Sequence, residues 1–162
     1  LILISTGYDH LQLFRNGIPE GRDKMEMIPG PGNHLSQMMY FHEDFFNLAI
    51  SESFRLKLEK AGISGIKTYP LEIQGITEKY YGILVTGRAG QRFIPAEKGL
   101  AMGIEFDPSS WDGSDVFLLK DLNKIIMTGK AKRVFRKARL KNVSLQHVLD
   151  YKWYNAAKKA AL

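Results

Sequence analysis

A repeat within the chain constrains its fold more than any other feature. At an offset of 77 residues, the segment AISESFRLKLEKAGISGIKTYPL aligns with IMTGKAKRVFRKARLKNVSLQHV. The alignment pairs Ser51 with Thr128, and both residue types commonly cap the start of a helix. It also pairs Gly65 with Asn142, and glycine and asparagine are the residues that most readily adopt a positive φ. The repeat therefore predicts a strand, a helix and a strand that occur twice.

We place the two units near residues 48–71 and 125–148. Each helix has one apolar face, formed by Phe54, Leu58 and Ala61 in the first unit and by Ala131, Phe135 and Ala138 in the second. The alternative is a chance match of two amphipathic helices. It is disfavoured because the caps, the apolar faces and the exit turns all agree.

The chain of 162 residues has the length of one ordinary domain. We predict a single α+β domain, with an antiparallel or mixed sheet covered by the two helices of the repeat. Residues 1–44, which are rich in glycine, proline and asparagine, are expected to form an irregular N-terminal segment. Residues 45–148 would contain both units, and residues 149–162 would be a C-terminal tail.

Three further segments have the composition of strands. Ile66–Ile73 would be one of them, and Pro70 would place it at a sheet edge or at a bulge because proline cannot donate to a ladder. Tyr80–Thr86 is the best candidate for a buried strand, and Gly103–Asp107 is a further one.

Composition excludes several kinds of chemistry. The chain has no cysteine, which excludes thiol catalysis, disulfides and thiolate metal sites. It also has no apolar run approaching the ~20 residues that a membrane helix needs, so we expect no membrane association. His34, His42, Glu43 and Asp44 are the densest group of metal-ligand residue types, but their spacing fits no known zinc motif. We therefore predict no catalytic residues, no metal and no cofactor.

Charge is divided unevenly along the chain. Residues 115–162 carry 12 Lys or Arg against 3 Asp or Glu, whereas residues 1–114 carry 11 against 14. The second helix concentrates the excess, and such a face is either simply solvated or a docking surface for an acidic partner. The predicted partner-binding residues are Lys132, Arg133, Arg136 and Lys137. Few aromatic residues lie among them, which disfavours RNA.

Two stretches resemble a known family. They are FFNLAISESFRLKLEKAGISGIKTYPLEI with YYGILVT, and DVFLLKDLNKIIMTGKAKRVFRKARLKNVSL, whose lead-in contains Asp115, Phe117, Leu119 and Lys120. About residues 44–148 are similar to the immunity proteins of bacterial polymorphic toxin systems, a family first named from a myxobacterial protein. This chain has Arg139 where the family pattern usually has glycine at the helix exit.

The resemblance implies a cytoplasmic protein that neutralises a cognate toxin by binding and occluding it. Its partner would be the toxin domain, encoded beside it, and not nucleic acid or a membrane. Two alternatives stay open, namely a basic nucleic-acid-binding domain and a small enzyme whose site is scattered over several strands. Salt-dependent binding to generic nucleic acid would identify the first, and turnover the second.

Overall fold

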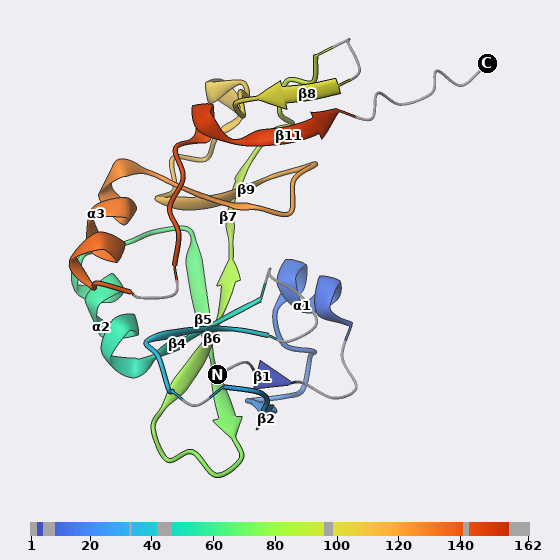
Figure 1. Cartoon of the computed structure of the whole chain (residues 1–162). Coiled ribbons are helices and arrows are strands. Elements are labelled where there is room, and N and C mark those ends of the chain that lie inside the picture. Colours follow the sequence, from blue (N-terminus) through green and yellow to red (C-terminus); the bar gives the residue numbers. More distant parts are fainter. Residues whose placement is uncertain are drawn as a thin grey trace.

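The computed structural model describes residues 3–4, 9–32, 34–41, 47–95, 99–140 and 143–155 (Figure 1). Their strands form three sheets. The largest has the strand order β1 (Leu3–Ile4), β2 (Met25–Pro29), β5 (Ile66–Ile73), β6 (Tyr80–Val85), β4 (Leu48–Ser51) and β3 (Met38–Tyr40). The second has the order β10 (Ile125–Met127), β9 (Val116–Leu119) and β7 (Gly87–Ala89). The third pairs β11 (Lys152–Asn155) with β8 (Gly99–Met102).

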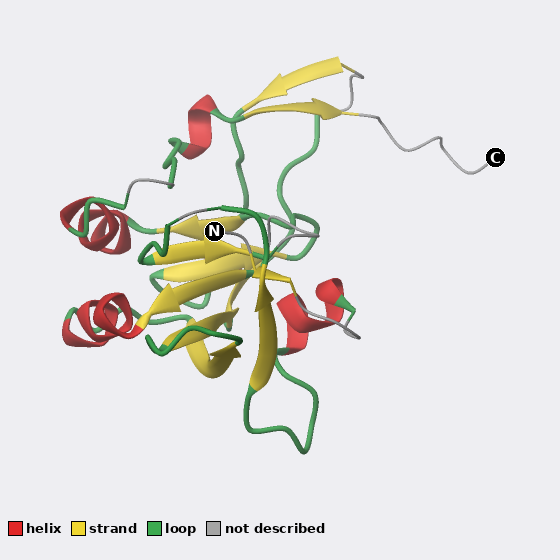
Figure 2. Ribbon diagram, turned by 60° about the horizontal axis from the view of Figure 1, so that its bottom comes forward, coloured by secondary structure: helices red, strands yellow, loops and turns green. Residues whose placement is uncertain are grey.

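Three α-helices accompany these sheets in the described part of the chain: α1 (His10–Asn16), α2 (Glu52–Lys60) and α3 (Gly129–Lys137). Two short 3₁₀ helices, η1 (Pro108–Ser110) and η2 (Val148–Asp150), complete the described elements. Helices α2 and α3 lie side by side, and α1 lies on the other side of the strands (Figures 1 and 2). None of the described helices is long and apolar enough to cross a bilayer.

The two larger sheets are joined by one continuous stretch of chain. Strand β6 passes through Thr86 directly into β7, which leaves its partner β5 and pairs in parallel with β9. Glycine is required at this junction because a Cβ on Gly87 would lie 2.1 Å from the hydroxyl oxygen of Ser114. A Cβ on Gly65 would lie 2.0 Å from the carbonyl oxygen of Val116. Strand β9 can therefore take the place beside β7 only because both positions lack a side chain.

The structure reproduces the first half of each repeat unit in detail. Strand β3 pairs with β4 and β9 pairs with β10, antiparallel in both cases. The hydroxyl of Ser51 accepts a hydrogen bond from the amide of Phe54 at 3.4 Å, and that of Thr128 accepts one from Ala131 at the same distance. Both helices thus begin at the predicted N-caps.

Both helices also end alike. Each ends at an alanine C-cap, and the next residue is left-handed in both units, with φ 60° at Gly62 and φ 52° at Arg139. Arg139 therefore occupies a position whose backbone conformation glycine adopts most readily.

The second half of the repeat differs. The exit strand of the first unit is β5, but residues 143–147 are not in a strand, and 141–142 lie outside the described residues. The expected single sheet covered by both helices is not confirmed, and β-structure dominates. Helix α2 packs on β4 and β6 of the large sheet, whereas α3 packs on β10 of the second sheet.

The terminal segments are more ordered than predicted. Within residues 1–44, expected to be irregular, lie α1 and three strands of the large sheet. Asp9 begins α1 by accepting hydrogen bonds from the amides of Leu11 and Gln12. In β2, Met25 and Met27 are buried and Glu26 is exposed, so this strand follows the usual alternation. In the expected tail, 149–162, residues 152–155 form β11.

Two strand predictions also need correction. Strand β5 lies inside the sheet and not at its edge, but its pairing with β2 begins at Leu71, so Pro70 has only β6 as a neighbour. Gly103–Asp107 does not form a strand, and its one β-bridge joins Phe106 to Arg92. The segment instead packs Ile104 and Phe106 into an apolar cluster with Phe117 and Leu119.

Candidate partner-binding surface

The four predicted residues lie on one helix, and none is paired with a described carboxylate. Arg133, Arg136 and Lys137 are exposed, and Lys132 is half-buried. Burial of Ala131 and Phe135 orients α3 so that these cations face away from the core. Two of them stand in the last turn, where positive charge is favourable because of the helix dipole.

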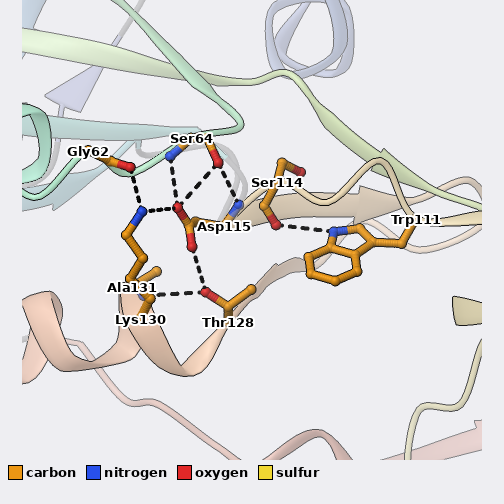
Figure 3. Close-up of polar contacts among 8 residues, drawn as sticks. All are labelled: Gly62, Ser64, Trp111, Ser114, Asp115, Thr128, Lys130 and Ala131. Atoms are coloured by element: carbon orange, nitrogen blue, oxygen red, sulfur yellow. Dashed lines mark hydrogen bonds and ion pairs between the residues drawn. The ribbon is translucent and has the colours of Figure 1, made fainter.

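A buried carboxylate fixes the start of this helix. Figure 3 shows that Asp115 accepts hydrogen bonds from the ammonium of Lys130 at 2.8 Å and the hydroxyl of Thr128 at 3.0 Å. It also accepts from the amide and the hydroxyl of Ser64, both at 3.2 Å. Lys130 reaches on to the carbonyl oxygen of Gly62 at 2.6 Å. One side chain thus ties the exit turn of α2 to the beginning of α3.

The pKa of Asp115 follows from these contacts. Burial by itself raises the pKa of a carboxyl group, because the charged form loses its hydration. The hydrogen bonds from Lys130, Ser64 and Thr128 outweigh burial and hold the pKa of Asp115 below its ordinary value of 3.8. The group is therefore a charged structural link at neutral pH.

Two hollows meet at the outer edge of β10. One, of about 310 Å³, lies toward the large sheet and is lined by Met38, Leu58 and Val85 among others. The other, of about 420 Å³, lies toward the third sheet and is lined by Ile104, Val148 and Tyr151 among others. Both share the walls Lys124, Ile125, Met127, Ser144 and Leu145. They lie on the two sides of a gap between β10 and the segment that follows α3.

Basic residues surround this gap. Lys124 lines both hollows, and Lys132 lines the second. A third hollow, of about 410 Å³, shares Phe135 and Leu145 with the first and is lined by Arg136 and Arg139. No described aspartate or glutamate lines any of the three. Of the predicted residues, Lys132 thus borders the gap together with Lys124, and Arg136 lines the adjacent hollow.

The third sheet presents an apolar face that the sequence analysis missed. Strands β8 and β11 project from the body as an arm (Figure 2). On the outer face of this arm Leu100, Met102 and Tyr154 are 76%, 70% and 71% exposed, and Leu100 lies directly opposite Tyr154. The residue patterns LAM at 100–102 and KWY at 152–154 are compatible with short strands. Residues 149–162 were expected to form a tail, so no pairing between these two stretches was predicted.

The opposite face of the arm fastens it to the body. The indole nitrogen of Trp153 donates to the carbonyl oxygen of Gly103 at 2.8 Å. The guanidinium of Arg92 lies 3.9 Å from the centre of the Trp153 ring, a cation–π contact. The outer apolar face is therefore held outward by specific contacts on the inner one.

The remaining candidates do not assemble into a site. His42, Glu43 and Asp44 lie outside the described residues, and His34 is exposed. His147 caps η2, where its Nδ1 accepts from the amide of Leu149 at 3.3 Å. In the described part of the chain no three His, Asp or Glu residues are grouped as metal ligands.

Comparison with known proteins adds no further constraint. No family model matches the chain, and no curated protein matches it.

Proposed function

We propose that this chain is a cytoplasmic immunity protein, which binds a cognate toxin domain and neutralises it by occlusion. The observation that carries the proposal is the outer face of the β8–β11 arm. Exposed large apolar side chains that cluster on one face are typical of protein interaction sites. Tyrosine, methionine and arginine are also the residues that such sites favour.

One hollow extends from the basic helix to the base of the arm, which supports a protein partner that contacts both. The larger hollow is bounded at one end by Lys132 of α3 and at the other by Ile104 and Tyr151, at the base of the arm. Nucleic acid would require mainly phosphate contacts and base stacking. A surface that joins an apolar face to a positively charged rim suits an acidic protein surface with apolar anchors.

Growth rescue tests the proposal directly. The toxin domain encoded beside this chain is expressed under control, and the chain is supplied in the same cells. We expect growth to be restored and the two proteins to purify as one complex. Failure to restore growth, or salt-dependent binding to generic DNA or RNA without toxin binding, would contradict the proposal.

Variants of the arm show which surface is responsible. The double substitution Leu100→Thr with Tyr154→Thr keeps strand-forming residues and removes the apolar face. We expect it to weaken toxin binding at least about tenfold, as loss of interface anchors does. The control is Leu11→Thr, an exposed apolar residue of α1, which is not part of the arm. Equal binding by both variants would remove the arm from the interface.

A further inference from the structure

One difference between the two halves of the repeat is a strand position that is filled beside β4 and unfilled beside β10. In the first unit β4 lies between β3 and β6, and β6 separates β4 from the exit strand β5. In the second unit β10 has β9 on one edge, as β4 has β3. Among the described strands nothing pairs with its other edge. The gap between β10 and residues 143–147 therefore corresponds to the position of β6.

Backbone hydrogen bonds fix the correspondence. The amide of Ser51 donates to Gln37 at 2.9 Å, and the equivalent amide of Thr128 donates to Asp115 at 2.9 Å. Backbone groups of successive strand residues point to opposite edges. The preceding residues, Ile50 and Met127, therefore point away from β3 and β9 respectively. Ile50 is paired with Tyr81 of β6, whereas Met127 faces the gap.

The next amide shows the same difference. The amide of Glu52 donates to the carbonyl oxygen of Lys79, just before β6, at 2.9 Å. Its equivalent is the amide of Gly129, and Gly129 lines the larger hollow. The gap thus offers the donors and the acceptor that β6 uses in the first unit.

We infer that an extended segment of the toxin binds in this gap, antiparallel to β10, with acidic side chains directed at its rim. The inference rests on the proposed function. Charge complementarity selects the occupant, since Lys124, Lys132, Arg136 and Arg139 line the three hollows and no described carboxylate does. The following segment of this chain is already used as the far wall, where Val143 and Leu145 pack on the core.

Hydrogen exchange at single amides tests the inference. The full chain is measured alone and saturated with the neighbouring toxin domain. We expect the amides of Met127 and Gly129 to exchange fast in the free chain and at least about 100-fold more slowly in the complex. The amides of Ile50 and Glu52, whose position is filled by β6, serve as references that are protected in both states.

Each other outcome of this experiment overturns the inference in a distinct way. Toxin binding without protection of Met127 and Gly129 removes the gap from the interface and leaves the proposed function standing. Absence of toxin binding overturns both. Protection in the free chain that is lost on dilution assigns the gap to a second copy, and protection independent of concentration assigns it to another segment of this chain.

A pair of variants provides a second measurement. Met127→Pro removes the amide hydrogen that faces the gap and leaves the bonds to β9 intact, since proline is tolerated at an outward-facing edge position. Met127→Ala is the matched control, because it shortens the side chain and keeps the amide. We expect the proline variant to bind toxin at least about tenfold more weakly than the alanine variant. Equal affinities would contradict the inference, and if the proline variant does not fold, the exchange measurement decides.

Discussion

Asp115 is the residue on which the joint between the repeat units depends. Its carboxylate, in a residue only 8% exposed, receives hydrogen bonds from Ser64 of the first unit and from Thr128 and Lys130 of the second. Hydrogen bonds to an ionised carboxylate are stronger than those to a neutral group, so these four contacts stabilise the fold most while Asp115 is charged. The stability of the whole chain should therefore depend on its ionisation.

The substitution Asp115→Asn should lower the free energy of unfolding at pH 7 by about 1–3 kcal/mol, because charged hydrogen bonds are lost. Folding lowers the pKa of this carboxyl below 3.8. Its contribution is therefore complete above that value and disappears as the pH falls through the folded-state pKa. Urea unfolding at pH 7 and pH 3 should show that the difference in free energy of unfolding between wild type and variant becomes smaller at the lower pH. The control is Asp23→Asn, at an exposed position. An equal difference in free energy of unfolding at both pH values would contradict this role of Asp115.

A second prediction at the same scale concerns the two left-handed helix exits. Arg139→Gly should raise the free energy of unfolding by about 0.5–1 kcal/mol, since a non-glycine residue is strained at φ 52°. Gly62→Ala should lower it by about 1 kcal/mol, although a Cβ there would contact nothing within 4 Å. Thermal or urea unfolding of both variants checks the pair. If Arg139→Gly lowers the free energy of unfolding instead, the contacts of the arginine side chain contribute more to stability than relief of the backbone strain.

At the scale of elements, α2 and α3 meet through Phe54 and Phe135. Their rings are 5.1 Å apart at 90°, an edge-to-face contact. Although Phe135 lies on a basic helix, its loss should therefore strongly reduce the free energy of unfolding. Phe135→Ala should reduce the free energy of unfolding by about 3–5 kcal/mol. Leu56→Ala, on the exposed side of α2, should change it by less than about 0.5 kcal/mol, and similar values for both would contradict the packing.

The charge of α3 gives a kinetic prediction. Reversal of Lys132, Arg133 and Arg136 to glutamate should slow association with the toxin domain about tenfold at low salt, because complementary charge steers encounter. The effect should shrink at moderate salt, where exposed charges are screened. Stopped-flow measurements at both salt concentrations check this. The control reverses Arg15, Lys67 and Lys79, which are exposed outside α3. Equal slowing by this control would show that net charge alone causes the effect.

At the scale of the molecule, the sequence predicted what depends on local pattern. Ser51 and Thr128 identified both helix starts, and the spacing of Phe54 with Leu58 identified a buried face, because caps and apolar periodicity are local signals. Pairing between distant strands is not local. The parallel pairing of Met25 with Leu71, and the pairing of Leu100 with Tyr154, could not be predicted for that reason.

The candidate surface was predictable to the same extent. Charge density alone identified Lys132, which borders the gap beside β10, and Arg136, which lines the adjacent hollow. The gap itself follows from the place of β6 in the first unit and its missing counterpart in the second, which only the sheet order reveals. Lys124 also lines the gap, but it was not predicted as a partner-binding residue because it lies outside the basic helix.

Titration of toxin activity tests the central claim most directly. A fixed amount of the proposed partner, a toxin domain encoded by a neighbouring gene, is mixed with rising amounts of the purified chain, and the remaining toxin activity is measured. An occluding immunity protein should abolish the activity linearly, with the endpoint at a fixed molar ratio of the two proteins. Toxin activity that persists unchanged in a large excess of correctly folded chain would contradict the claim.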